Sequence, residues 1–171
     1  MAATYEPIAS TTLTSDSSSV TFNSIPATFT DLVIVMSVGK GIGYTTGLQF
    51  NGVTTSTYSR TRLSGDGTSA LSGRNTTSDN FKYIPLGSYG NGTTLGTENI
   101  VAHLFNYSNT TTFKTTLSRS NAATTGLDAS VGLWQSTAAI SSIRIAPDVD
   151  TPARTNFLTG SIFTLYGIKA A

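Results

Sequence analysis

Apolar and polar residues alternate along this chain in short runs, which are separated by joints rich in Ser, Thr, Gly and Asn. Alternation with a period of two sends successive side chains to opposite faces, the pattern of a half-buried β-strand. The runs recur at the short spacing of β-sandwiches and barrels, and none shows the apolar spacing of an amphipathic helix. The pattern predicts an all-β fold, an antiparallel jelly-roll-like β-sandwich of about 8–10 strands.

Two apolar runs are the strongest predicted strands. Residues 31–38 contain the continuous apolar run 32–36, which indicates a central strand covered on both faces. Residues 160–169 supply the last strand. An immunoglobulin-like sandwich is the second possibility, but it needs only about 100 residues, so the length favours the jelly roll. We expect one domain over residues 1–171, with residues 1–10 forming either an extended arm or an edge strand.

Turn residues add two local expectations. Asn51-Gly52 follows the alternating run 48–50, and Asn-Gly after such a run is a strong hairpin signal because both residues tolerate positive φ. The partner strand of this hairpin is expected at residues 57–63. Residues 64–80 are polar and Gly-rich, and they are expected to form a long surface loop.

Composition narrows the possible partners. Charged residues make up only 11% of the chain, but 38% are hydrophobic, a content that disordered chains lack. A net charge of +1 gives no long-range attraction to nucleic acid or anionic membrane, so neither is an expected partner. The chain has no cysteine, which excludes disulfides, zinc–thiolate sites and thiol catalysis. No signal peptide or membrane-spanning run is expected.

Candidate catalytic residues are few. His103 is the only histidine, and no nucleophile motif accompanies it. We interpret it as a structural or surface residue that shares a strand face with Val101 and Phe105. The two glutamates, Glu6 and Glu98, cannot be placed together as the acid pair of a glycosidase. The chain is therefore expected not to be an enzyme.

No cofactor or metal site is expected either. Residues 39–43 are glycine-rich but precede a strand, whereas phosphate-binding loops precede a helix. Asp66, Asp148 and Asp150 lie in predicted loops without the dense oxygen ligands of a calcium site, so they are interpreted as turn residues.

One strand carries a candidate contact surface. Tyr58, Arg60 and Arg62 fall on one face by the period of two, and Arg74 follows in the predicted loop. Tyr and Arg are enriched in protein interfaces, so these residues are candidates for partner binding, the alternative being a solvated outer face. Trp134 could stack on a sugar, but a core position is the favoured interpretation.

Several motifs along the chain resemble those of small structural proteins of tailed bacteriophages. The similarity covers nearly the whole chain. The motifs are Tyr5-Glu6-Pro7-Ile8-Ala9, Val20-Thr21-Phe22, Ser24-Ile25-Pro26, Thr30-Asp31-Leu32-Val33, Leu48-Gln49-Phe50-Asn51-Gly52, Tyr107-Ser108-Asn109-Thr110-Thr111, Gly132-Leu133-Trp134-Gln135-Ser136-Thr137 and Phe163-Thr164-Leu165-Tyr166-Gly167-Ile168.

The resemblance implies a non-enzymatic virion protein, a capsid decoration (cement) protein. Such a protein would be a homotrimeric jelly roll that binds the lattice of the major capsid protein and stabilises the shell. It would be located on the virion, at the capsid surface, after assembly in the host cytoplasm. We expect Tyr5 and Pro7, in the N-terminal segment, to reach a neighbouring subunit.

The alternative that the resemblance leaves open is a tail-fibre or receptor-binding head domain. Tyr44, Tyr89 and Trp134 would then form a stacking platform for host surface polysaccharide. The chain lacks the extended coiled-coil or repetitive stretches that give tail fibres their reach, which favours the decoration protein. A carbohydrate-binding module outside a virion is a third possibility.

Overall fold

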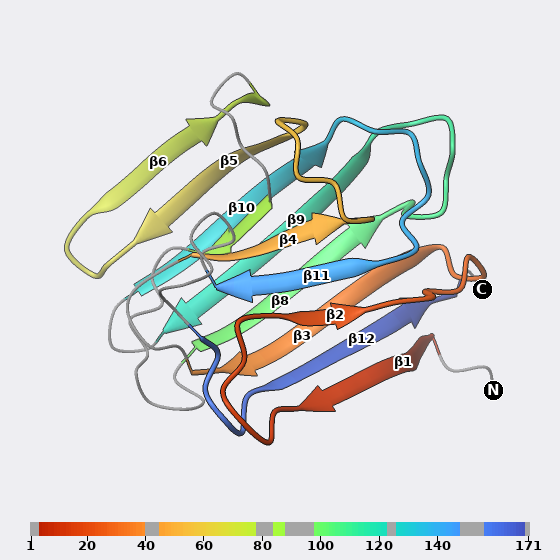
Figure 1. Cartoon of the computed structure of the whole chain (residues 1–171). Coiled ribbons are helices and arrows are strands. Elements are labelled where there is room, and N and C mark those ends of the chain that lie inside the picture. Colours follow the sequence, from red (N-terminus) through yellow and green to blue (C-terminus); the bar gives the residue numbers. More distant parts are fainter. Residues whose placement is uncertain are drawn as a thin grey trace.

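The computed structural model describes residues 4–39, 45–77, 84–87, 98–122, 126–147 and 156–169. These residues form strands, turns and loops, and every pairing between strands is antiparallel. Two sheets lie face to face, with the smaller one in front of the larger one in Figure 1. The predicted all-β sandwich is therefore confirmed, with twelve strands in the described residues in place of the expected 8–10.

The large sheet has eight strands and makes up the back layer of Figure 1. Its two edges are β1 and β6. In spatial order it contains β1 (Tyr5–Thr12), β12 (Ile162–Ile168), β3 (Asp31–Val38), β8 (Glu98–Phe105), β9 (Lys114–Ala122), β10 (Gly126–Trp134), β5 (Tyr58–Gly65) and β6 (Ala70–Asn75).

The small sheet has four strands, in the order β2 (Val20–Phe22), β11 (Ile143–Pro147), β4 (Thr46–Phe50) and β7 (Ile84–Gly87). The chain changes sheet repeatedly, because β2, β4, β7 and β11 in one layer are separated in sequence by strands of the other layer. Such repeated crossing between two antiparallel sheets makes the sandwich jelly-roll-like.

The hydrophobic core lies between the two sheets. The large sheet contributes Leu32, Ile34 and Met36 of β3, all nearly inaccessible to solvent, and the small sheet contributes Leu48 and Phe50 of β4. Every second residue of these strands points inward, as a period of two requires. The other half of the large sheet's residues points away from the core and forms the opposite surface of this sheet.

Three local predictions need correction. Residues 70–75 of the predicted 64–80 loop form strand β6, which pairs with β5 through a turn at residues 66–69. The Asn51-Gly52 turn exists, with positive φ at both residues, but it carries the chain from β4 to the other sheet and makes no hairpin with β5. Of the predicted N-terminal arm, Tyr5 to Ser10 belong to β1, so the edge-strand alternative is the correct one.

Candidate functional site

The candidate site is the outer face, which we define as the side of the large sheet turned away from the small sheet. Each strand sends every second side chain to it, and the strand register aligns these side chains in rows. One row contains Tyr166, Val33, His103, Leu117 and Val131. The next row contains Thr164, Val35, Val101, Arg119, Ala129 and Leu63.

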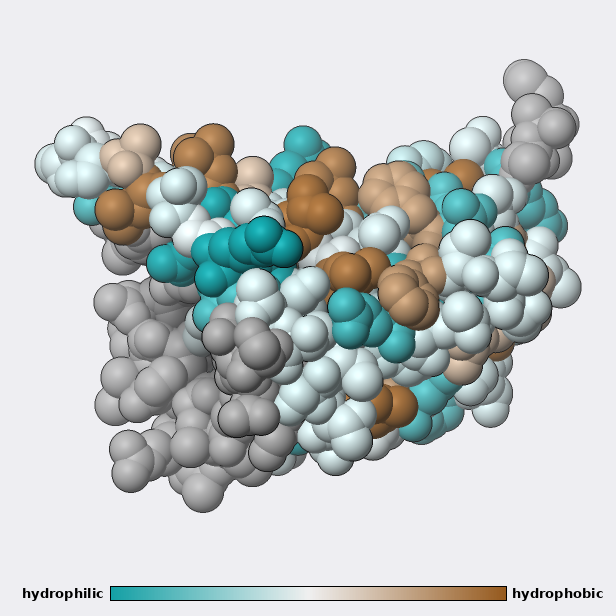
Figure 2. All heavy atoms as spheres, turned by 90° about the horizontal axis from the view of Figure 1, so that it is seen from above, coloured by the Kyte–Doolittle hydropathy of each residue, from teal (hydrophilic) through white to brown (hydrophobic). Residues whose placement is uncertain are grey.

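The outer face is unusually apolar for a solvent-exposed surface. Leu117, Val131 and Leu127 are 50%, 54% and 57% exposed. Leu71 and Phe113 apart, every exposed large hydrophobic residue of the described chain lies on this face. Figure 2 views the molecule along its layers and shows brown side chains gathered along the edge that corresponds to the outer face. Large exposed apolar patches mark interaction sites on soluble proteins.

The alternation of β9 and β10 explains why apolar side chains are outside. Ser118 and Ser130 point inward and are 2% exposed, whereas Leu117 and Val131 point outward. Strand β7 lies directly over these inward positions, and the Ser118 hydroxyl donates a hydrogen bond to the Leu86 carbonyl at 3.4 Å. The narrow space under β7 accepts only small inward side chains, so the large apolar side chains of these strands occupy the solvent side.

The side of the small sheet turned away from the core has a different character, and it is partly covered, because Gln49 is only 5% exposed. Thr21, Arg144 and Gln49 lie opposite one another on β2, β11 and β4. The Arg144 guanidinium donates to the Gln49 side-chain oxygen at 2.9 Å. This row is polar, whereas the two rows of the outer face named above are mainly apolar.

Shallow hollows cross the outer face. One, of about 400 Å³, is lined by Tyr5, Val33, His103 and Leu117 among others. A second, of about 470 Å³, extends past Leu127. Both are also lined by Val101, Arg119 and Ala129, so they adjoin in the middle of the sheet. A groove with apolar walls and one central guanidinium suits a protein surface with matching side chains.

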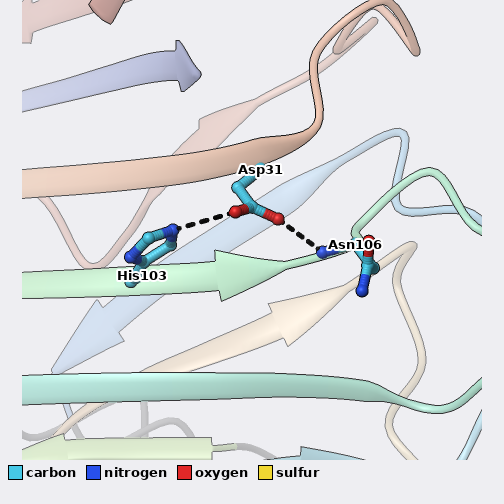
Figure 3. A network of polar contacts seen from close by, with 3 residues as sticks. All are labelled: Asp31, His103 and Asn106. Carbon is cyan, nitrogen blue, oxygen red and sulfur yellow. Dashed lines mark hydrogen bonds and ion pairs between the residues drawn. The ribbon is translucent and has the colours of Figure 1, made fainter. Parts of the chain in front are cut away.

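His103 lies at one wall of this groove and makes a polar network with the end of β8. Its Nε2 lies 3.3 Å from Oδ2 of Asp31, and the other carboxylate oxygen accepts the Asn106 backbone N–H at 2.7 Å. Figure 3 shows Asp31 between the two groups. The ring also stacks on Phe105, with 4.2 Å between centroids.

The network suits a structural role. Asn106 has a φ of 48°, in the left-handed region, and the Asp31 carboxylate fixes its N–H where the chain leaves β8. Within the described residues, Asp31 is the only hydrogen-bonding partner of the His103 ring. Its row neighbours are Val33 and Leu117, and within the described residues no hydrogen bond joins the imidazole to a serine or threonine hydroxyl.

The N-terminal candidates lie on the outer face. Tyr5 is 54% exposed and packs edge-on against Tyr166, with 6.4 Å between ring centroids. Pro7 is exposed and lies opposite Tyr166 in the register of β1 and β12. The structure therefore brings these two residues to the same surface as Leu117 and Val131, although by way of an edge strand and without an arm.

The residues of the second candidate group do not share one surface in the structure. The group consists of Tyr58, Arg60, Arg62 and Arg74. Tyr58 and Arg60, predicted as partner-binding residues, point into the sandwich and are buried, so in this structure they offer no surface to a partner. The reason is that the face chosen by the period of two is the inner face of β5, where these residues lie opposite Trp134 and Gly132 of β10. Arg62, on the same inner face, is half-buried, whereas Arg74 is exposed on β6, opposite Thr61 of β5.

Trp134 is a core residue, as its favoured interpretation predicted. It is 1% exposed and stacks on Tyr58 at 6.2 Å between centroids, so it offers no platform for a sugar. Tyr44, Tyr89, Asp148, Asp150 and residues 40–43 lie outside the described residues.

Asp66 is a turn residue, as predicted. Its carboxylate accepts the N–H groups of Thr68 and Ser69 at 2.8 and 2.7 Å. These backbone hydrogen bonds are the main cause that holds the pKa of Asp66 below its ordinary value. Among the described residues, no three His, Cys, Asp or Glu side chains gather as metal ligands would.

The sequence interpretation missed Leu117, Leu127, Val131 and Leu63 as surface residues. Apolar side chains in alternating strands are ordinarily assigned to the core. The available signal was the set of small and hydroxyl residues at the intervening positions of β9 and β10, which leave room for a closely packed strand. This signal can be interpreted only when β7 is known to lie over these small residues of β9 and β10.

The comparisons add no relative from which a role could be transferred. No protein-family model matches the chain, and no curated protein matches it. No helix in the part of the chain that the structure describes is long and apolar enough to cross a membrane.

Proposed function

We propose that this protein is a non-enzymatic structural protein of a tailed-phage virion that decorates the capsid. It binds the lattice of the major capsid protein through the outer face and stabilises the assembled shell. The observation that carries the proposal is the exposure of Leu117, Leu127 and Val131 on one surface of the large sheet. The motifs that resemble those of phage structural proteins are the reason for proposing the major capsid protein as the partner.

The size of the outer face supports a stable protein contact. Eight strands spaced about 4.8 Å apart, each with about eight residues at roughly 3.3 Å, cover on the order of 1,000 Å². A standard protein–protein interface buries about 800 Å² on each partner. A docked capsid surface of ordinary size could therefore cover most of the exposed apolar residues.

The charges on the face favour a partner with an acidic group. Arg119 lies among Val101, Leu117 and Ala129, and within the described residues it has no ion-pair partner. Arginine surrounded by apolar contacts is a common anchor of interfaces. A carboxylate on the capsid surface opposite Arg119 would give the contact its orientation.

Binding would stabilise the shell by mass action. A ligand that binds the assembled lattice and not the free subunits shifts the equilibrium towards the intact shell by RT ln(1 + [L]/Kd). This mechanism needs a rigid body with an adhesive surface and no chemical step. An eight-stranded sheet backed by a packed core is such a body.

Electron microscopy of purified particles tests the proposal. The particles are those of the phage whose genome encodes this chain. We expect regular density for the protein on the shell, with the eight-stranded sheet turned towards the capsid. Density confined to the tail, or its absence from the particle, would refute the proposal.

A further inference from the structure

The edges of the two sheets are protected unequally. Strand β1 contains Pro7 and has a register shift between Pro7 and Ala9. Strand β2 has only three residues, and β7 has four, with a register shift in its pairing to β4. Proline, irregular register and short length all hinder an edge from pairing with another strand.

Strand β6 has none of these protections. Its six residues, Ala70–Asn75, pair with β5 in unbroken register, and on its other side no described strand pairs with it. Ala70, Leu71, Ser72 and Arg74 are exposed, and Arg74 is the only charged residue. A regular exposed edge of this kind is a template for an added strand.

The register of the β5–β6 hairpin shows which backbone groups are free to pair. The Asp66 N–H donates to the Ser69 carbonyl at 3.3 Å, so this pair is hydrogen-bonded. Hydrogen-bonded pairs alternate along an antiparallel ladder, which turns the backbone groups of Leu71 and Gly73 towards β5. Those of Ala70, Ser72 and Arg74 point away from the sheet.

We propose that β6 pairs antiparallel with β6 of a second copy of this chain, about a two-fold axis at Ser72. In this register Ser72 faces Ser72 of the second copy, and Ala70 faces Arg74. All three outward-pointing residues then form backbone hydrogen bonds across the junction. The proposal concerns self-association alone and does not depend on capsid binding. It replaces the homotrimer that the resemblance to cement proteins implies with a dimer.

The side chains fit this register. Leu71 is 47% exposed on the inner side of β6, and it would lie opposite Gly73 of the second copy. The space beside Gly73 is open, since an added Cβ would meet only the Arg62 side chain, at 3.5 Å. The two Leu71 side chains become diagonal neighbours, close enough for leucines to touch and cover each other.

The charges on and around β6 also allow a second copy of the chain to pair with this edge. Each Arg74 faces an alanine, so no like charges lie directly opposite each other, an arrangement that would destabilise the pair. A net charge of +1 adds little repulsion between copies. The same two-fold operation extends the outer face across the junction into one continuous sheet surface.

Sedimentation equilibrium of the purified protein tests the proposal. We expect a mass of twice the 17.9 kDa chain. Ser72→Pro removes an outward N–H without touching the bonds to β5, so this variant should lose the dimer. Ser72→Ala keeps the backbone and should remain dimeric. A wild-type monomer or trimer, or a dimer that survives Ser72→Pro, would overturn the proposal.

A second variant keeps the test decisive if Ser72→Pro fails to fold. The chain has no cysteine, so Ser72→Cys introduces a single thiol. Directly opposed residues in a hydrogen-bonded pair have Cα atoms about 5.5 Å apart, within the range of a disulfide. Mild oxidation should therefore give a covalent dimer, and Thr21→Cys on the small sheet should not. Absence of cross-linking at position 72 would equally refute the proposal.

Discussion

Gly132 shows how closely the two sheets approach each other. A Cβ added at this position would lie 2.4 Å from Cγ2 of Ile84 and 2.5 Å from the Thr116 hydroxyl. We expect Gly132→Ala to lower the free energy of unfolding by about 1–3 kcal/mol, the usual cost of overpacking a core. Urea denaturation measures this change.

Gly65→Ala is the matched control for this substitution. Gly65 lies in the neighbouring strand, and its added Cβ would meet only the Ser69 carbonyl oxygen, at 3.8 Å. This variant should stay within about 0.5 kcal/mol of the wild type. Equal free energies of unfolding for Gly132→Ala and Gly65→Ala would show that β7 does not pack tightly against β10.

Tyr58 links stability to alkaline pH. Burial raises its pKa from 10.0 to about 12, although the hydrogen bond from the Phe50 N–H acts in the opposite direction. Above pH 10 the unfolded chain therefore loses this proton before the folded chain does. The stability that Tyr58 contributes is constant below pH 10 and falls between pH 10 and about 12, by up to roughly 3 kcal/mol.

Chemical denaturation across this pH range, compared with Tyr58→Phe, measures the effect. The variant loses the hydroxyl that accepts from Phe50 and donates to the Val53 carbonyl, both at 3.1 Å, so it should be less stable at neutral pH. Its stability should decline less steeply between pH 10 and 12. Parallel declines in the two proteins would contradict the assignment to Tyr58.

At the scale of elements, Asn51 holds two strands of the small sheet together. Its side-chain oxygen accepts the N–H groups of Ser141 and Ser142 at 2.9 and 3.1 Å, just before β11. Its φ of 52° also suits asparagine better than alanine. We expect Asn51→Ala to cost roughly 2–4 kcal/mol in thermal or urea unfolding.

Asn109→Ala is the control for this element. Asn109 also accepts two backbone N–H groups, from Thr111 and Thr112, but within one exposed turn. This local arrangement should be worth about 1 kcal/mol or less. If both substitutions lower the free energy of unfolding equally, the hydrogen bonds of Asn51 that link β4 to β11 stabilise the fold no more than a local turn does.

The elements also show how far the sequence could be interpreted. Alternation correctly placed Val101, His103 and Phe105 on one face, because that property depends only on neighbouring residues. The Asn51-Gly52 turn was predicted correctly for the same reason, but the predicted hairpin with β5 does not form, because β4 pairs with the more distant β11 and β7. Strand β6 was missed because a pattern of exposed Ser, Gly and Arg does not distinguish an edge strand from a loop.

At the scale of the whole molecule, the two sides of the sandwich differ. The side of the small sheet turned away from the core carries the polar row of Thr21, Arg144 and the buried Gln49, whereas the two central rows of the outer face are mainly apolar. The sandwich could be predicted from the local pattern, but this difference could not. It depends on which strands lie beneath β7, which only the sheet order determines.

The occupancy of Val131→Glu on capsids tests most directly whether the outer face is the adhesive surface. Val131 is 54% exposed, so the fold should tolerate the substitution, but docking would bury an added carboxylate. We expect affinity for particles stripped of the protein to fall at least about tenfold, a loss of about 1.4 kcal/mol. Thr21→Glu, on the polar side, should bind like the wild type. Undiminished binding of Val131→Glu, or loss of binding with Thr21→Glu alone, would contradict this assignment.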